Sequence, residues 1–178
     1  SLRRIVQFKA IRPDLIILDL RGNVNTRLMK LDKGEYDAII LACAGLIRLG
    51  FEDRIKQPLD AQTSLPAVGQ GALGIENRKG DEVVRELIKP LIDSKTMTEV
   101  LAERAMNATL EGSCSVAIAG YAKTMGEELL LKGLVGNVES GSILRAERTG
   151  STSQPKALGE LVANQLLDIG AGKLLEGG

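Results

Sequence analysis

The stretch LIILDLRGNVNTRLMKLDKGEYDAIILACA, residues 15–44, decides how the first part of the chain is interpreted. Its two ends, residues 15–20 and 36–44, are nearly continuous apolar runs, which is typical of strands that are covered on both faces. Between these runs, apolar residues recur at the spacing of one helix face: Val24, Leu28 and Leu31. The order strand, helix, strand predicts a right-handed βαβ unit in a parallel sheet, with Cys43 buried in the second strand.

Upstream of this unit, the chain starts on a predicted helix. Ser1 is a favourable N-cap residue, and the helix is expected to end before Pro13. Two buried strands cannot by themselves make a complete, covered sheet. We therefore expect the first strands of this domain to lie upstream of the 178 residues. The alternative is a processed or engineered start of a small complete domain.

A loop rich in glycine and proline, SLPAVGQGALG at residues 64–74, indicates a crossing between domains. After it, Asp81 is placed to cap a helix, and residues 96–99 form a capping box that opens another. Three strand-like runs follow, with glycine turn signals between them: residues 115–123, 128–136 and 142–149. Together with a final amphipathic helix opened by Pro155, they predict a small α+β domain with a three-stranded antiparallel sheet.

The composition of the 178 residues excludes several classes of protein. No histidine is present, which excludes Ser-His-Asp catalysis and histidine-bound metal, and two cysteines cannot form a four-thiolate zinc site. Two Tyr, two Phe and no Trp argue against stacking on nucleic-acid bases. Since no apolar run reaches the ~18 residues of a membrane span and no signal peptide opens the chain, we expect a cytoplasmic protein without metal, nucleic-acid or membrane partners.

The charge is unevenly distributed, although 23 basic and 23 acidic residues cancel: residues 1–30 carry a net charge of +5. Arg3 and Arg4 lie in the first turn of the predicted first helix, where cations are unfavourable beside the helix dipole. Arg21 and Arg27 flank the next helix start, at the carboxyl end of a predicted strand, where parallel sheets bind ligands. These positions predict a site for a ligand with several carboxylates or phosphates. The alternative is a pair of surface helices with solvated arginines.

Cys114 follows a predicted helix end in the small-residue segment LEGSCS, residues 110–115. A lone loop cysteine is usually incidental, so the residue pattern leaves both a reactive and an inert thiol open. The paired acids of the chain lie on helix ends or turns, and none of them is placed as a general acid.

Seven blocks of sequence, in continuous order over nearly the whole chain, resemble the hydroxymethylbilane synthase (porphobilinogen deaminase) family. They are SLRR (1–4), RPDL (12–15), LRGNVNTR (20–27), GEYDA (34–38), AGLIRLG (44–50), LPAVGQGA (65–72) and AERA (102–105) leading to LEG (110–112). The resemblance implies a monomeric three-domain enzyme, with two periplasmic-binding-protein-like domains, of which this chain is the C-terminal portion. Residues 1–65 would be the second part of domain 2, residues 66–91 a crossing segment that belongs to domain 1, and residues 92–178 the C-terminal α+β domain.

The resemblance also implies an activity and a cofactor. The family condenses four porphobilinogen molecules into the linear tetrapyrrole hydroxymethylbilane, with release of ammonia, in heme biosynthesis. It builds this chain on a dipyrromethane that a thioether joins to a cysteine, and the arginines bind acetate and propionate side chains. The matching positions form two sets: Cys114, Ser1, Arg3 and Arg4 for the cofactor, and Arg21, Arg27 and Arg48 for the substrate.

Two positions depart from the family pattern, because Ser113 and Asn25 stand where glycine is common; this alters loop stiffness but removes no functional side chain. The family's catalytic aspartate belongs to domain 1. We therefore expect no catalytic residue in this chain, no activity from it alone, and a requirement for the missing upstream domain as a partner beside porphobilinogen. Competing interpretations are a non-catalytic carboxylate-binding module of periplasmic-binding-protein fold and, against the low aromatic content, a nucleic-acid-binding protein.

Overall fold

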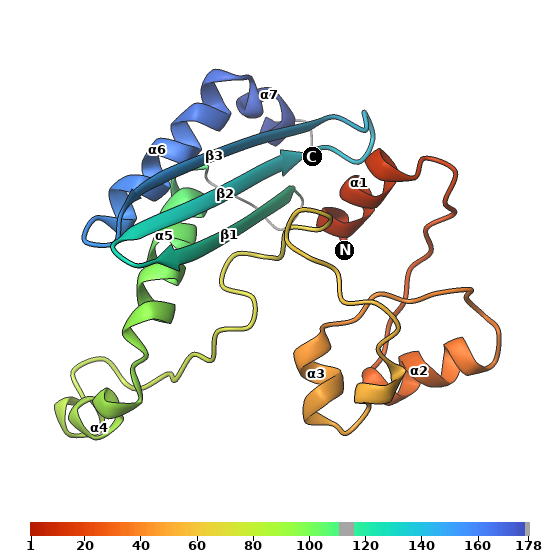
Figure 1. The fold of residues 1–178 in the computed structure, drawn as a ribbon, viewed down its shortest axis with the longest axis horizontal. Coiled ribbons are helices and arrows are strands. Elements are labelled where there is room, and N and C mark those ends of the chain that lie inside the picture. The colour runs from red at the N-terminus through yellow and green to blue at the C-terminus, as the bar shows by residue number, and fades with distance from the viewer. Residues whose placement is uncertain (111–115, 177–178) are drawn as a thin grey trace. The chain divides into compact units, whose positions relative to one another are not determined.

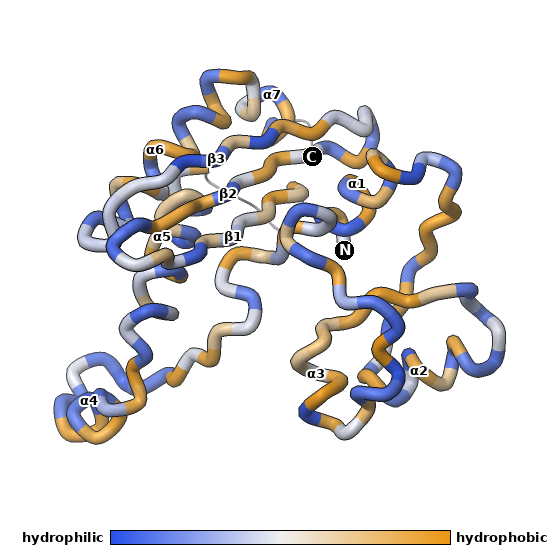
Figure 2. The backbone as a smooth tube through the Cα atoms, in the orientation of Figure 1, coloured by the Kyte–Doolittle hydropathy of each residue, from blue (hydrophilic) through white to orange (hydrophobic). Residues whose placement is uncertain are grey.

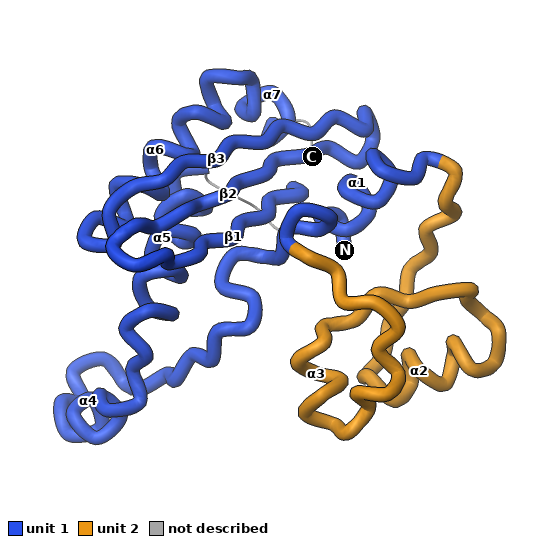
Figure 3. The backbone as a smooth tube through the Cα atoms, viewed as in Figure 1, with its two compact units in different colours: residues 1–13, 61–178 blue, residues 14–60 orange. Residues whose placement is uncertain are grey.

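The computed structural model describes residues 1–110 and 116–176; Cys114 lies outside the described residues. The chain divides into two compact units (Figure 3). Unit 1 combines residues 1–13 with the residues from 61 onward, and unit 2 is formed by residues 14–60. Helix α1 (Leu2–Ile11) therefore folds together with the C-terminal part of the chain. The division of the whole protein at residues 65 and 91 stays a prediction.

Unit 1 is built on an antiparallel sheet of three strands in chain order: β1 (Ala117–Met125), β2 (Glu128–Gly136) and β3 (Ile143–Ser151) (Figure 1). In the register of this sheet, Gly120, Gly133 and Ala146 lie side by side. Gly126, with a φ of 65°, lies in the tight turn between the first two strands. The antiparallel meander predicted from the sequence is confirmed.

One face of the sheet is covered by α5 (Ser94–Thr109) and α6 (Pro155–Asp168), with α7 (Ala171–Glu176) beside them (Figure 1). Met106 of α5 is fully buried where two strand glycines face it. A methyl group on Gly133 would lie 2.5 Å from the Met106 sulfur, and one on Gly120 would lie 2.7 Å from its terminal carbon. The glycines therefore allow the helix to approach the sheet closely. No helix in the described part of the chain is long and apolar enough to cross a membrane.

The opposite face of the sheet is covered in part by α1. A second, smaller core forms there from Val6, Leu65, Ala117, Ala119 and Leu134. Val6 packs directly on Gly136 of β2, where an added methyl group would lie 2.9 Å from the Val6 Cγ1. Helix α1 is thus seated on the sheet at a position that a larger side chain on the strand would block.

Two glutamates of α5 bind the edge of strand β1. The carboxylate of Glu103 accepts a hydrogen bond from the backbone N–H of Ala122 at 2.8 Å, and that of Glu99 accepts one from Thr124 at 2.8 Å. Four helical residues rise about 6 Å and two strand residues about 6.8 Å, so side chains one turn apart match alternate N–H groups of the strand. An edge whose donors are satisfied in this way is protected from pairing with another strand.

Unit 2 contains three short helices: α2 (Val24–Asp32), α3 (Cys43–Arg48) and the 3-10 helix η1 (Glu52–Arg54). Helix α2 ends at Gly34, and α3 ends in the same way at Gly50; both glycines have positive φ, the backbone conformation that favours glycine at a helix end. At each end, backbone N–H groups bond back to the carbonyls of the last turn in a Schellman arrangement. An ion pair of 2.5 Å between Arg54 and Asp32 joins η1 to α2.

The described residues do not form the predicted βαβ unit. Neither residues 15–20 nor residues 36–44 belong to a sheet, and Cys43 is the partly exposed first residue of α3 rather than a buried strand residue. Ile16 is 87% exposed. Figure 2 shows hydrophobic residues in the segment between α1 and α2. A strand needs a hydrogen-bonded neighbour, and an apolar pattern cannot show whether one is present. The periplasmic-binding-protein-like part of the fold therefore stays a prediction.

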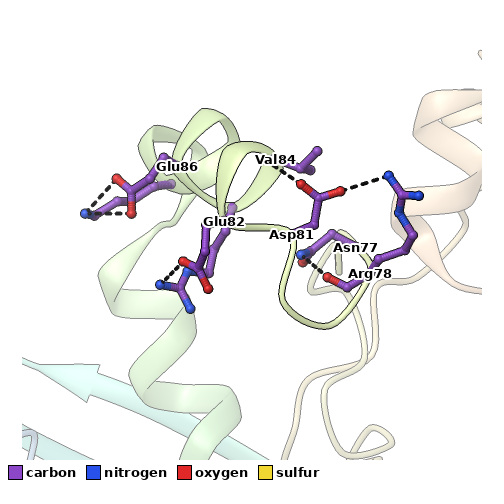
Figure 4. A network of polar contacts seen from close by, with 8 residues as sticks. Asn77, Arg78, Asp81, Glu82, Val84 and Glu86 are labelled. Carbon is purple, nitrogen blue, oxygen red and sulfur yellow. Dashed lines mark hydrogen bonds and ion pairs between the residues drawn. The ribbon is translucent and has the colours of Figure 1, made fainter.

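The segment before α5 carries α4 (Glu82–Ile88) and the 3-10 helix η2 (Lys89–Leu91). Asp81 caps α4 as predicted: it accepts a hydrogen bond from the N–H of Val84 at 3.2 Å and pairs with Arg78 at 3.0 Å (Figure 4). Two further ion pairs follow at the same spacing, Glu82–Arg85 and Glu86–Lys89. These exposed pairs stabilise a short helix by about 0.2–0.5 kcal/mol each.

Candidate functional site

The first turn of α1 holds one group of arginines. Ser1 lies at the N-cap position, and its carbonyl oxygen accepts hydrogen bonds from the N–H groups of Arg4 and Ile5, at 2.9 and 3.0 Å. Its side chain makes no capping bond, and no acidic residue lies in this turn. Arg3 and Arg4 therefore add two positive charges to the positive end of the helix dipole.

Arg3 is half-buried, and desolvation by this burial lowers the pKa of its guanidinium. The shift means that the surroundings disfavour the positive charge. An anionic ligand close to the guanidinium would offset that penalty through charge-assisted hydrogen bonds. The first turn of α1 therefore has the electrostatic character of an anion-binding site.

A second group of arginines lies at the start of α2, in unit 2. Gly22 has a φ of 119°, and a methyl group there would lie 2.9 Å from Thr26, so the position requires glycine. The side chain of Asn23 caps the helix by accepting hydrogen bonds from the N–H and the hydroxyl of Thr26, at 2.8 and 2.9 Å. The Nε of Arg27 donates to the carbonyl oxygen of Gly22 at 2.8 Å, which fixes the guanidinium on this loop.

The chemistry of this loop suits a carboxylate. Arg27 uses one of its five N–H groups to hold Gly22, and the remaining planar fork is the kind of donor that binds a carboxylate at two points. Arg21, one residue before Gly22, is exposed. The hydroxyl of Tyr36 donates to the carbonyl oxygen of Asp19 at 2.8 Å, so the chain is also held just before Arg21.

The structure brings the predicted site residues together in two places. Ser1, Arg3 and Arg4 lie at the start of α1 in unit 1, whereas Arg21 and Arg27 flank the start of α2 in unit 2. Arg48 is exposed at the end of α3, also in unit 2. Because Cys114 lies outside the described residues, its place beside either group stays a prediction.

Two residues that support these groups were not found from the sequence. Gln7 is buried in α1 and hydrogen-bonds to the backbone of Arg3, and Tyr36 holds the segment before Arg21. In the sequence, Gln7 stands out only as a polar residue next to the apolar Val6, and Tyr36 only as one of two tyrosines in the chain. Neither signal identifies the partner of the side chain.

Two helix starts rich in arginine, on a chain of mixed α and β structure, have the electrostatic character of anion-binding sites. Residues 1–86 match the family model described as "Porphobilinogen deaminase, dipyromethane cofactor binding domain", and residues 97–168 match "Porphobilinogen deaminase, C-terminal domain". The chain belongs to the porphobilinogen deaminase family.

Curated relatives agree with this assignment. The porphobilinogen deaminase of Ruthia magnifica subsp. Calyptogena magnifica is 63% identical over 176 residues, which cover 99% of this chain and 58% of the relative. The porphobilinogen deaminase of Vesicomyosocius okutanii subsp. Calyptogena okutanii (strain HA) is 58% identical over 176 residues, again 99% of this chain and 58% of the relative. The chain therefore spans a little more than half the length of these two proteins.

Proposed function

We propose that these residues are part of a hydroxymethylbilane synthase, an enzyme of tetrapyrrole biosynthesis that condenses four porphobilinogen molecules and releases ammonia. The observation that carries the proposal is the match of both halves of the chain to porphobilinogen deaminase models. The two arginine groups support it, because porphobilinogen and its linear products carry acetate and propionate side chains.

The residues present fit a dipyrromethane cofactor. Such a group needs cationic partners for its carboxylates, and the first turn of α1 offers a half-buried arginine whose charge gains from an anion. When bound, the dipyrromethane supplies the pyrrole end to which substrate units are added. In the proposal, Arg3 and Arg4 bind its carboxylates beside Ser1, and the sulfur of Cys114 holds it as a thioether.

The second arginine group is proposed to bind substrate. Arg27 is oriented by its bond to Gly22, so its fork would meet a carboxylate without first having to be ordered. Arg21 and Arg48 are exposed and would engage carboxylates of porphobilinogen or of the growing chain.

No described acidic residue is assigned a proton-transfer role. Glu103 is buried, but its two carboxylate oxygens accept hydrogen bonds from the N–H groups of Gly69 and Ala122, at 2.6 and 2.8 Å, so it serves the fold. We therefore expect the 178 residues, assayed alone, to bind porphobilinogen without turning it over.

The intact mass of the complete protein, measured after denaturation, tests the proposal. We expect an excess equal to one covalent dipyrrole and a positive colour reaction for pyrroles. Cys114→Ala should lose both signals. Cys43→Ala is the matched control, since the chain has only these two cysteines, and it should keep both.

A bare mass in protein that turns over porphobilinogen, or a dipyrrole retained in Cys114→Ala, would contradict the assignment of Cys114. Binding of porphobilinogen by protein that never carries a dipyrrole and never releases ammonia in its complete form would instead support a non-catalytic carboxylate-binding module.

A further inference from the structure

Gln7 is a polar side chain in the interior of unit 1. It lies on α1 and is 0% exposed. Its side-chain nitrogen donates to the carbonyl oxygens of Arg3 at 3.0 Å and Leu65 at 3.1 Å, and its oxygen accepts from the N–H of Leu65 at 2.8 Å. These are three of the four hydrogen bonds that an amide side chain can make. A buried amide with these partners has one orientation.

Apolar packing alone does not fix the place of α1 in this way. Val6, the neighbouring residue, is buried on Gly136, but apolar contact has no direction and tolerates a small slide or rotation of the helix. Hydrogen bonds weaken steeply when the donor and acceptor move out of line. Gln7 therefore sets the rotation and the height of α1, whereas Val6 supplies the contact.

The segment to which Gln7 bonds is itself fixed to the sheet. Leu65 is buried, and the carbonyl oxygen of the next residue, Pro66, accepts a hydrogen bond from the N–H of Gly120 in β1 at 3.1 Å. Four residues after Leu65, the N–H of Gly69 donates to Glu103 of α5 at 2.6 Å. Leu65 is therefore a fixed reference point for α1.

The other partner of Gln7 is the backbone of Arg3, in the first turn of the helix. Helix ends fray because their backbone groups lack partners within the helix, and the side chain of Ser1 adds no cap here. A bond from the buried Gln7 to the carbonyl oxygen of Arg3 links this turn to Leu65. The turn that carries Arg3 and Arg4 is thereby tied to the sheet.

We infer that Gln7 is a positioning residue that holds Arg3 and Arg4 where they meet the carboxylates of the dipyrromethane. The inference rests on the proposed function. Gln7 touches no ligand in this scheme, because it acts through the backbone of Arg3. Removing its polar atoms should misplace the arginines and leave the rest of the sheet domain folded.

The test compares two variants in the complete protein. Gln7→Met keeps the length and approximate volume of the side chain but removes all three hydrogen bonds, whereas Val6→Ala loosens α1 through packing alone. The fraction of molecules that carry the covalent dipyrrole is measured by intact mass, and kcat/KM for porphobilinogen is measured beside it. Because misplacement of a binding group by about 1 Å can cost about 100-fold, we expect Gln7→Met to lower kcat/KM about 10- to 100-fold and to reduce occupancy. Val6→Ala should keep both near the wild-type values.

A double-mutant cycle separates positioning from general loss of structure. In a background that carries both Arg3→Ala and Arg4→Ala, Gln7→Met should have little further effect, because both side chains that Gln7 positions are already removed. Full additivity of the two changes, or equal effects of Gln7→Met and Val6→Ala, overturns the inference. If Gln7→Met does not fold, Gln7→Asn, which keeps the amide but is one carbon too short to span both partners, replaces it with the same expectations.

Failure of the inference and failure of the proposed function give different results. If the wild-type protein carries the dipyrrole and turns over porphobilinogen while Gln7→Met matches it, only the role of Gln7 is wrong. If the wild-type protein carries no dipyrrole and has no turnover, the proposed function is wrong and the role of Gln7 falls with it.

Discussion

Replacement of Glu103 by Gln tests whether a buried carboxylate is needed to hold two backbone donors at once. Glu103 is 6% exposed, and its two oxygens accept hydrogen bonds from Gly69 at 2.6 Å and Ala122 at 2.8 Å. A glutamine has one acceptor oxygen, so its NH₂ group would face one of these N–H groups. A buried donor left without a partner costs about 1–3 kcal/mol. Relief of the desolvation of the carboxylate offsets part of this cost, and we expect a net loss of about 1–2 kcal/mol.

Glu99→Gln is the matched control, one turn earlier on the same helix. Glu99 accepts one hydrogen bond, from the N–H of Thr124, and an amide oxygen can accept that bond as well. Glu99→Gln should therefore lower the free energy of unfolding by no more than about 0.5 kcal/mol. Urea unfolding measures both variants, and for a chain of this size about 1 kcal/mol corresponds to a shift in Tm of about 2–4 °C. Equal losses in the two variants would contradict the requirement for two acceptors.

The pH dependence of the free energy of unfolding, compared between the wild type and Glu103→Gln, gives a second check. Burial raises the pKa of Glu103, against the opposite effect of the bonds from Gly69 and Ala122, so the folded pKa lies above the unfolded value. As the pH falls through the folded pKa, the folded wild type takes up a proton before the unfolded chain does and becomes more stable relative to Glu103→Gln. The difference in the free energy of unfolding between the wild type and Glu103→Gln should therefore become larger as the pH falls. A difference that becomes smaller would contradict the raised pKa of Glu103, because the two hydrogen bonds would then favour the charged carboxylate more than its burial disfavours it.

Three further changes have definite expected outcomes. Thr124→Val should raise the free energy of unfolding by about 1 kcal/mol in urea titration, because the buried Thr124 hydroxyl has no hydrogen-bond partner in the described structure. Gly133→Ala should lower it by about 1–3 kcal/mol, since the new methyl group would lie 2.5 Å from the Met106 sulfur; an unchanged melting curve would contradict the close packing. Arg27→Lys keeps the charge but loses the bond to Gly22 and the planar fork, so KM for porphobilinogen should rise about 10-fold in steady-state assays of the complete protein, and an unchanged KM would count against the assigned role.

Features that depend on neighbouring residues were predictable from the sequence. The end of α2 at Gly34, the cap of α4 at Asp81 and the three-stranded meander all follow from local residue types and spacings. The start of α5 is a local near miss, because Asp93 caps the helix by accepting from the N–H of Thr96, in place of the predicted box at residues 96–99. Both choices obey the same capping rule, and the sequence offers two acceptable residues.

Features that depend on distant residues were not predictable. Residues 15–20 and 36–44 have the composition of buried strands, yet a strand exists only when another strand pairs with it. Leu65, a partner of Gln7, lies 58 residues away from it, and Gly69, a partner of Glu103, lies 34 residues away; no periodicity in the sequence connects these residues. The arginines of the candidate site were identified by residue type and motif, whereas the side chains that hold them in place required the structure.

The buried polar side chains of unit 1 divide its stabilisation into two kinds. The apolar core between the sheet and its two long helices accounts for most of the burial. Its apolar contacts have no direction, and the strand glycines that face Met106 set how closely α5 approaches the sheet. Gln7 and Glu103 are the buried polar residues among those described, and both bind backbone between residues 65 and 69. This loop is therefore joined by directional hydrogen bonds to both α1 and α5. Because α1 carries Arg3 and Arg4, a change that loosens the loop should disturb the anion-binding turn before it unfolds the sheet.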